Sequence, residues 1–242
     1  MKDKNFYAII LAAGFSSRMG VLKPLLPVGD CPAIVRTVNA TLAAGVAPVV
    51  VTGYRGDEIK NALDGAGAIV VHNPDFADGM FTSVVAGARA LPPDASAFFL
   101  LPADCCTIEP RTLSELAAQI VSRETICYPT YGGKRGHPPV IPAALAAGLI
   151  AHEPDNTGAK GYFNRFPSVT VEVADAGVLR DMDTPSDYAE TLRALGLPTS
   201  PTETQARELF AKYGTAPDFA ALGFEVLLRE GYPDAAILVR DC

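Results

Sequence analysis

Short apolar runs that alternate with segments of helical periodicity constrain the fold of this chain more than any other feature. The apolar runs cover residues 7–11, 49–52, 68–71 and 97–101, and the helical segments between them cover residues 32–44, 56–63 and 80–91. Strands that are apolar on both faces and alternate with helices predict a mostly parallel sheet covered on both sides. We therefore expect a Rossmann-like, three-layer α/β sandwich with a twisted sheet.

The second half of the chain carries shorter elements. Helical spacing predicts helices at residues 111–121 and 185–195, and short apolar runs predict strands at residues 125–129, 137–141 and 169–173. The Gly132-Gly133 pair between the first two of these strands indicates a β-hairpin. We expect this hairpin to be inserted near the functional site.

A stretch of proline, threonine and serine at residues 198–201 predicts a linker. We therefore divide the chain into an α/β domain, residues 1–197, and a small C-terminal helical extension, residues 202–242, with two or three helices. About forty residues seldom form a stable core alone, so we expect the extension to pack on the main domain or on another chain. It faintly resembles part of the histidine-aspartate phosphohydrolase domain, but it contains no histidine, which excludes that metal chemistry.

Composition narrows the class of partner. The net charge is −7 and no basic run is present, so we expect no binding of nucleic acid as the main function. No apolar run approaches the length of about 18 residues that a membrane span needs, and no secretory leader is recognisable. We therefore expect a cytoplasmic protein that does not associate with a membrane. The five cysteines form no Cys-x-x-Cys pair, which favours reduced and mostly buried thiols.

The first apolar run ends in a loop of small residues that is followed by two cations. Ala12-Ala13-Gly14 leads through Ser16 to Arg18, and Lys23 follows shortly after. Backbone N–H groups in such a loop can approach an anion closely, and the two cations add positive charge. The alternative is an ordinary turn, but the combination of serines and cations in one short span favours a phosphate-binding loop. Neither the dinucleotide fingerprint nor the P-loop pattern is present.

Two aspartates follow other predicted elements. Asp104 lies where the fourth strand ends, and a carboxylate there is suited to Mg²⁺, which prefers hard oxygen ligands. The alternative is that Asp104 caps the next helix. Asp183 presents a similar choice, because either Asp183 or Thr184 can cap the helix that begins with Pro185. Sequence spacing alone does not show whether the two carboxylates meet.

These segments resemble the nucleotidyltransferases of the MobA-like NTP transferase family over about residues 8–195, and most of all the molybdenum cofactor cytidylyltransferases. The segments that carry the resemblance are residues 11–23, 73–83, 135–138 and 181–187. The first and last are shared with many sugar and alditol nucleotidyltransferases, whereas the two in the middle are more specific. Ala13 favours CTP, because the guanylyltransferases to the same cofactor have Ala-Gly-Gly in this loop.

The resemblance implies transfer of CMP from CTP to a phosphate of molybdopterin, with release of pyrophosphate and with a molybdoenzyme as the client. It implies that Arg18 and Lys23 are catalytic and that Asp104 and Asp183 together hold Mg²⁺. It assigns acceptor binding to Arg135, Gly136 and His137. It assigns nucleotide binding to Leu11, Ala12, Ala13, Gly14, Ser16, Gly53, Gly79 and Ser83.

Some positions depart from the family pattern and leave alternatives open. Cys106 stands where the family usually has proline, and residues 155–160 match a pterin-holding segment only loosely, with Lys160 in place of arginine. His137 can also be interpreted as a residue that packs against the hairpin. The alternatives for function are a guanylyltransferase, a sugar- or alditol-phosphate nucleotidyltransferase, and a non-catalytic nucleotide-binding or partner-docking module.

Overall fold

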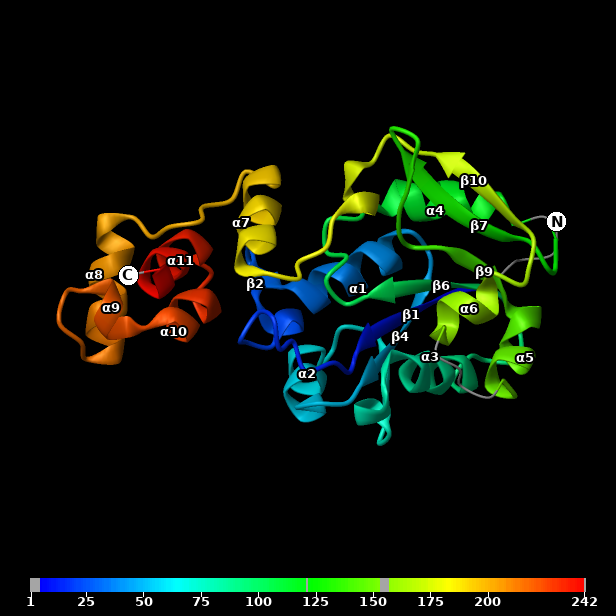
Figure 1. Cartoon of the computed structure of the whole chain (residues 1–242), viewed down its shortest axis with the longest axis horizontal. Coiled ribbons are helices and arrows are strands. Elements are labelled where there is room, and N and C mark those ends of the chain that lie inside the picture. Colours follow the sequence, from blue (N-terminus) through cyan, green and yellow to red (C-terminus); the bar gives the residue numbers. More distant parts are fainter. Residues whose placement is uncertain (1–4, 121, 153–156, 242) are drawn as a thin grey trace. The chain divides into compact units, whose positions relative to one another are not determined.

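The computed structural model describes residues 5–120, 122–152 and 157–241 (Figure 1). The chain forms two compact units. Unit 1 comprises Met1–Gly14 and Ile34–Arg180, and unit 2 comprises Phe15–Ala33 and Asp181–Cys242. The loop that follows the first strand therefore belongs, from Phe15 onward, to the same unit as the C-terminal helices.

Unit 1 is built on a mostly parallel sheet, as predicted. Its strand order is β10-β7-β9-β6-β1-β4-β5, with β8 paired to β7. The strands are β1 Asn5–Ala12, β4 Ala47–Thr52, β5 Ile69–His72, β6 Ala95–Pro102, β7 Ile126–Tyr131, β8 Lys134–Arg135, β9 Val140–Pro142 and β10 Ser168–Glu172. Strands β5, β4, β1 and β6 are parallel neighbours, β10 is parallel to β7, and β9 is antiparallel to both β6 and β7.

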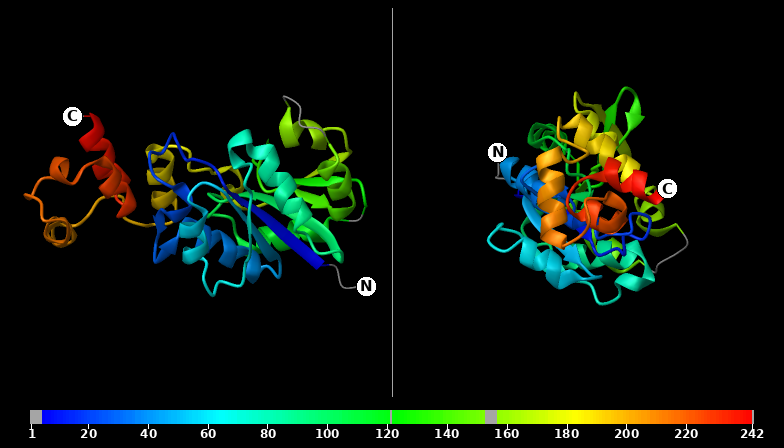
Figure 2. Two further views of the ribbon diagram at one scale, coloured as in Figure 1. Left: turned by 90° about the horizontal axis from the view of Figure 1, so that it is seen from below. Right: turned by 90° about the vertical axis from the view of Figure 1, so that its left-hand side faces the viewer.

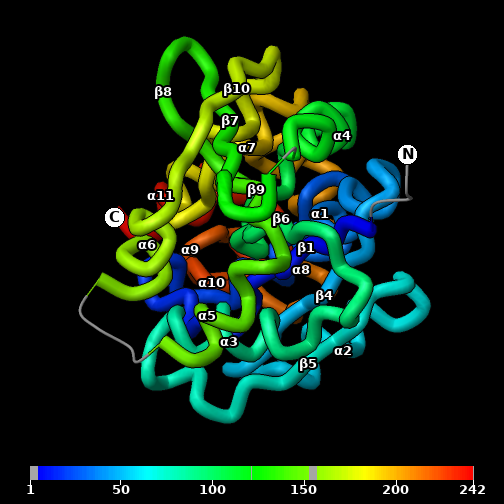
Figure 3. The backbone as a smooth tube through the Cα atoms, turned by 90° about the vertical axis from the view of Figure 1, so that its right-hand side faces the viewer, coloured from blue at the N-terminus to red at the C-terminus, as the bar shows by residue number. Residues whose placement is uncertain are grey.

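Helices cover both faces of this sheet, which confirms the predicted three-layer α/β architecture (Figure 3). One face carries α3 (Met80–Arg89), α5 (Ala146–Ile150) and α6 (Gly158–Phe163), and its core includes Ile9, Phe98 and Tyr162. The other face carries α1 (Ala33–Ala43), α2 (Gly56–Ala62) and α4 (Pro110–Ala118). Hydrophobic periodicity does not reveal α5 and α6, because each is shorter than two turns.

The hairpin around Gly132 and Gly133 is present, but its return strand differs from the prediction. The strand that pairs with β7 across the turn is β8, at Lys134–Arg135, and residues 137–139 are not in a strand. Pro138 and Pro139 have no N–H to donate to a ladder, so pairing resumes only at β9. Strand β9 then lies between β6 and β7 in the middle of the sheet.

Unit 2 contains the short strands β2 (Pro27–Val28) and β3 (Cys31–Pro32), the helix α7 (Pro185–Ala194) and the C-terminal helices. The described part of the extension forms four helices instead of two or three: α8 Glu203–Tyr213, α9 Phe219–Leu222, α10 Phe224–Arg229 and α11 Pro233–Asp241. The extra breaks fall at Gly214 and Gly223, whose φ angles of 63° and 81° are in the region that favours glycine.

The extension packs within unit 2. Helix α11 lies beside α7, as Figure 1 and Figure 2 both show. The guanidinium of Arg193 on α7 contacts both carboxylate oxygens of Asp234 on α11, at 2.6 and 2.7 Å. The hydroxyl of Thr199 donates to Asp234 at 2.5 Å. These contacts hold the start of α11 against the end of α7. The division into domains at residues 1–197 and 202–242 stays a prediction.

The structure also bears on the cysteines and on membrane insertion. Cys105, Cys106 and Cys127 are buried, Cys31 is half-buried, and none of these four forms a disulfide, as predicted. Cys242 lies outside the described residues. Among the helices described, none combines the length and the apolar character that crossing a bilayer requires.

A buried carboxylate ties three segments of unit 1 together. Asp175 is 3% exposed and accepts hydrogen bonds from the Glu109 N–H, the Thr112 hydroxyl and the Gly177 N–H, at 2.9, 2.9 and 2.8 Å. It joins the start of α4 to the 3₁₀ turn η4 (Ala176–Leu179). Because η4 contacts the loop after the hairpin, Asp175 supports that loop as well.

We therefore expect Asp175→Ala to lower the free energy of unfolding by about 2–3 kcal/mol, because it leaves buried donors without an acceptor. Urea denaturation measures the change. Asp64→Ala is the matched control, because Asp64 is exposed and its removal should change the free energy by no more than about 0.5 kcal/mol. Equal values for the two variants would contradict the structural role of Asp175.

Candidate functional site

The carboxyl ends of the central strands of unit 1 meet at one edge of the sheet. The Tyr54 N–H, after β4, donates to the Ala13 carbonyl at 3.1 Å, and the Ala103 N–H, after β6, donates to the Leu11 carbonyl at 3.0 Å. A Cβ atom on Gly53 would lie 2.9 Å from the Cβ of Ala13, so only glycine fits this close approach. The structure thus brings together the predicted positions 11–14, 53 and 104.

Asp104 lies in a rigid turn directly after β6. Its side chain is largely buried, with 7% of the residue exposed. The turn is fixed from α1: the Thr37 hydroxyl donates to the Ala103 carbonyl at 3.1 Å, and the Arg36 guanidinium donates to the Cys106 carbonyl at 3.0 Å. The N-cap of α4 is Glu109, so the alternative in which Asp104 caps that helix is wrong.

Cys106, which departs from the family pattern, adds no charge beside Asp104. Burial raises the pKa of the Cys106 thiol to about 12, and the nearby Arg36 only partly offsets this. The thiol is therefore neutral at physiological pH and behaves as a small apolar side chain.

The segment predicted to contact the base is organised around a buried amide. Asn73 is 2% exposed, and its side-chain N–H₂ group donates to the hydroxyls of Thr82 and Ser83, both at 2.9 Å. These bonds tie the end of β5 to the first turn of α3. Gly79 is exposed and precedes α3 with a φ of 110°, whereas Ser83 is buried. The nucleotide-binding roles of Gly79 and Ser83 stay predictions.

The loop predicted to bind the acceptor is held by its backbone, and its side chains are exposed. The Gly136 N–H donates to the Pro129 carbonyl at 2.9 Å and the His137 N–H donates to the Val178 carbonyl at 2.7 Å. Gly136 lies directly against that carbonyl, so a side chain would not fit there. Because His137 is exposed, the structure does not support its interpretation as a residue buried against the hairpin.

Sequence reasoning did not identify the residue that orients Arg135. The Arg135 guanidinium lies 3.1 Å from the ring centroid of Tyr128, in a cation–π contact. Thr130 is the residue opposite Arg135 in the hairpin, and Tyr128 is two residues from Thr130 on the same face of β7. A diagonal aromatic neighbour of this kind is the signal that would have found it. In the loosely matching segment 155–160, residues 155 and 156 lie outside the described residues, and Lys160 lies on α6.

In unit 2, Ser16 organises the first turn of the predicted phosphate-binding loop. Its backbone has a φ of 55°, and its carbonyl accepts the N–H groups of Met19 and Gly20 at 3.0 and 3.2 Å. Its hydroxyl accepts the Lys23 N–H at 3.1 Å. These hydrogen bonds therefore fix the backbone from Ser16 to Lys23, from which the side chains of Arg18 and Lys23 extend.

The two cations of this loop share one carboxylate. Asp183 contacts the Arg18 guanidinium at 2.6 Å through one oxygen and the Lys23 ammonium at 2.9 Å through the other. Arg18 remains 69% exposed at its side chain, whereas Lys23 is 19% exposed. Burial alone would raise the pKa of Asp183, but the hydrogen bonds and charges of Lys23 and Arg18 outweigh it and lower the pKa. The helix cap at α7 is Thr184, in a capping box with Asp187.

The carboxylates of Asp104 and Asp183 fit a magnesium ion only if substrate phosphates complete its coordination. Within the described residues, no group of three or more His, Cys, Asp or Glu side chains is placed to hold a metal. Mg²⁺ commonly uses one or two carboxylates together with substrate phosphates and water, which Asp104 can satisfy. Both oxygens of Asp183 are engaged by cations, so one of these contacts would have to open. Asp104 and Asp183 belong to different units, and their sharing of one ion stays a prediction.

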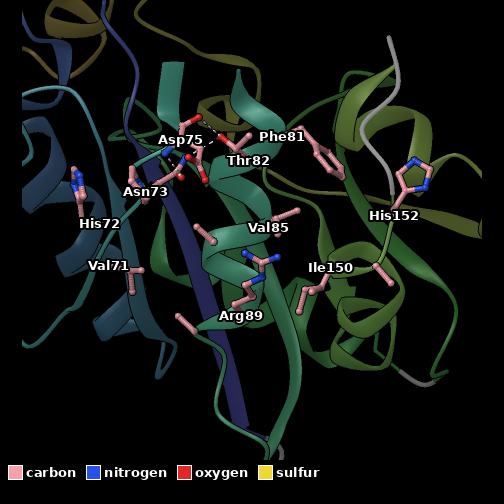
Figure 4. A pocket seen from close by; sticks show the side chains of 14 residues that line it. Val71, His72, Asn73, Asp75, Phe81, Thr82, Val85, Arg89, Ile150 and His152 are labelled. Carbon is pink, nitrogen blue, oxygen red and sulfur yellow. Dashed lines mark hydrogen bonds between the residues drawn. The ribbon is translucent and has the colours of Figure 1, made fainter. Parts of the chain in front are cut away.

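A groove runs along α3 in unit 1 (Figure 4). Its volume is about 600 Å³, and its lining includes Val71, Phe81, Val85, Arg89 and Ile150. The residues that line it include none of the predicted catalytic, nucleotide-binding, acceptor-binding or metal-binding positions. The lining does include Asn73, Phe81 and Thr82, so the groove adjoins the segment 73–83 that is predicted to contact the base.

The lowered pKa of Asp183 predicts a pH-dependent effect of Asp183→Asn on stability. A carboxylate whose pKa falls on folding stabilises the protein above its ordinary pKa, and this contribution is lost as the pH falls through the folded value. At pH 7 we expect the variant to be less stable by about 1 kcal/mol, because the ion pairs are partly exposed. The difference should shrink as the pH falls below about 4, and it should vanish once the pH is below the lowered pKa of Asp183.

Chemical denaturation at a series of pH values measures this difference. Asp64→Asn, at an exposed position, is the control and should show no comparable gap. A gap between wild type and Asp183→Asn that persists unchanged into acid would show that the effect does not arise from the ionised carboxylate.

Comparison with known proteins agrees with this arrangement. In sequence, the chain is 29% identical over 181 residues to the molybdenum cofactor cytidylyltransferase of Escherichia coli K12, covering 74% of this chain and 92% of that protein. In structure, it resembles Rv0371c from Mycobacterium tuberculosis H37Rv, with a TM-score of 0.68, 25% identity, and coverage of 78% of this chain and 98% of that one.

A nucleotidyl transferase from Methanothermobacter thermautotrophicus is similar to the same degree. Its TM-score is 0.68 and its identity 26%, over 79% of this chain and all of that one. The family model described as the MobA-like NTP transferase domain matches residues 8–169. These residues contain most of β1, the loop with Arg18 and Lys23, and the turn with Asp104. The chain therefore belongs to the MobA-like NTP transferase family.

Proposed function

We propose that this protein transfers CMP from CTP to the terminal phosphate of molybdopterin and releases pyrophosphate. The observation that carries the proposal is the pair of cations, Arg18 and Lys23. One turn and the carboxylate of Asp183 hold them together. They follow the loop in which Ala13 favours CTP. The similarity to the Escherichia coli cytidylyltransferase over most of both chains supports the choice of nucleotide and acceptor.

In the proposed reaction, an oxygen of the acceptor phosphate attacks the α-phosphorus of CTP in line with the leaving group. The new P–O bond forms as the bond between the α-phosphorus and the bridging oxygen to the β-phosphate breaks, and pyrophosphate leaves with that electron pair. Because the acceptor phosphate is already ionised at neutral pH, no general base and no protein nucleophile are needed. Catalysis then consists mainly of positioning and charge neutralisation.

The two cations have different tasks in this proposal. Arg18, which is mostly exposed, binds the β- and γ-phosphates together with the backbone of residues 12–16. Lys23, which is mostly buried, stabilises the charge that develops on the α-phosphate in the transition state. The nucleotide base is bound by Gly53, Gly79 and Ser83. Asp104 and Asp183 would hold Mg²⁺, which supplies further neutralisation of the phosphate charge when bound.

The acceptor binds, in this proposal, at Arg135, Gly136 and His137. The exposed guanidinium of Arg135 is suited to bidentate pairing with a phosphate, and the contact with Tyr128 limits its conformations. Lys160 is a point charge where the family has arginine, so we assign the main phosphate contact on the acceptor side to Arg135. A molybdoenzyme would receive the product.

The substrate assignment predicts a specific pattern of pyrophosphate release. The full-length protein, Mg²⁺ and a molybdenum-bearing pterin should release pyrophosphate from CTP, and GTP and ATP should give at most a small fraction of that rate. Omitting the pterin should abolish the release. Faster release from GTP would overturn the base assignment, and release that requires a sugar or alditol phosphate in place of the pterin would overturn the acceptor assignment.

The assignment of Lys23 predicts a loss of turnover without a loss of the fold. Lys23→Ala should lower kcat by about 100- to 1000-fold, since removal of one transition-state contact has an effect of this size. Circular dichroism should still show the native secondary structure. Lys60→Ala, at an exposed position on α2, is the matched control and should retain full activity. Full activity of Lys23→Ala would remove Lys23 from the mechanism.

A further inference from the structure

We propose that the C-terminal helices hold the phosphate-binding loop in position, and that Phe224 of α10 is the main positioning residue. The family model ends at residue 169, so this extension lies outside the matched domain. The phosphate role of the loop rests on the proposed function, whereas the contacts described below do not. All of them lie within unit 2.

The first contact is between α10 and the loop itself. The ring of Phe224 lies against Gly20: a Cβ atom on Gly20 would be 3.3 Å from Cε1 of Phe224. The φ of Gly20 is 80°, a conformation that favours glycine, and the missing side chain lets the ring approach the backbone. The Arg240 guanidinium, on α11, lies 5.6 Å from the centroid of the same ring. The extension thus places an aromatic ring on the turn between Arg18 and Lys23.

The second contact lies at the other end of the same segment. Gly231, at the end of α10, lies against Pro27, because a Cβ atom on Gly231 would be 3.2 Å from Cγ of Pro27. From α7, the Tyr188 hydroxyl donates to the Pro27 carbonyl at 2.5 Å. The segment from Gly20 to Pro27, which includes Lys23, is therefore held at both ends by helices that follow it by more than 150 residues in the chain.

The helices that make these contacts are themselves fastened. Asp234 at the start of α11 binds Arg193 of α7 through its carboxylate, and its N–H donates to the Thr199 carbonyl at 3.0 Å. Leu227 and Leu228 of α10 are fully buried. The extension is thus a packed support and not a loose tail, and it can transmit a fixed position to the loop.

A support of this kind matters because the cations act through geometry. Displacement of a catalytic group by about 1 Å can lower a rate by about 100-fold. The ammonium of Lys23 is held by Asp183. In this proposal, the extension positions the backbone that carries this side chain. We therefore expect loss of the Phe224 contact to loosen the loop before it unfolds the protein.

Hydrogen–deuterium exchange on the full-length protein tests this inference directly. Phe224→Ala should raise the exchange rate of peptides that cover residues 15–27 by about tenfold or more. The matched control is Phe219→Ala. Phe219 is a half-buried phenylalanine of the same extension, and its ring lies 5.5 Å from that of Phe210 instead of against the loop. Equal exchange of residues 15–27 in the two variants would overturn the proposal.

Two further variants keep the test decisive if Phe224→Ala folds poorly. Tyr188→Phe removes only the hydroxyl that holds Pro27 and should also raise exchange in this segment. Phe224→Tyr keeps the ring against Gly20 and should restore exchange to the wild-type rate. If Phe224→Tyr behaves like Phe224→Ala, the extension does not position the loop in this way. If Tyr188→Phe leaves the segment unchanged, α7 does not hold its other end.

Steady-state kinetics separates this inference from the proposed function. Phe224→Ala should lower kcat/KM for CTP by about 100-fold, with a raised KM, and Phe219→Ala should leave both unchanged. If wild-type protein turns over no nucleotide, the proposed function fails, and the exchange experiment still decides whether the extension positions the loop. If the wild-type protein is active, and Phe224→Ala and Phe219→Ala have the same KM and the same exchange pattern, then only the positioning role of Phe224 is overturned.

Discussion

The ion pairs of Asp183 with Arg18 and Lys23 are the interaction on which the site in unit 2 depends. The partners are 160 residues apart in the case of Lys23, so the pairs link the first loop to the segment before α7. A lone carboxylate in a partly buried place would be unfavourable, and two adjacent cations would repel each other. The carboxylate of Asp183 stabilises both cations and leaves one net positive charge, with Arg18 still open to solvent. In the proposed function, a triphosphate would replace the carboxylate at Arg18.

Unit 1 contributes a different kind of order. There the backbone, more than the side chains, fixes the site: the ends of β1, β4 and β6 are joined by hydrogen bonds at Ala13 and Leu11. Gly53 and Gly136 permit close approach of neighbouring segments, and Asp175 supports the segment behind the acceptor loop. The side chains that are proposed to meet substrates, such as Arg135 and His137, extend from this frame and are exposed. An exposed cation such as Arg135 on a fixed backbone is suited to bind an anionic ligand such as a phosphate.

Much of the fold follows from the sequence, because buried parallel strands have a distinctive apolar pattern. Strand β1 and helix α1 were predictable from it. The cap of α7 was narrowed to Asp183 or Thr184, and the structure selects Thr184. The return strand of the hairpin was not, because Pro138 and Pro139 interrupt an otherwise apolar run. The site could be predicted only as separate segments. That Asp183 would pair with both cations, and that Phe224 would lie on Gly20, depends on contacts between distant parts of the chain, which local patterns do not encode.

The central claim is that this chain joins a cytidine nucleotide to a pterin phosphate, and identification of the reaction product tests it most directly. The full-length protein is incubated with CTP, Mg²⁺ and the molybdenum-bearing pterin, and the pterin is then examined by mass spectrometry. We expect a pterin whose mass is increased by one CMP group, joined through a new phosphate–phosphate linkage. An unmodified pterin, or consumption of CTP without any adduct, would contradict it.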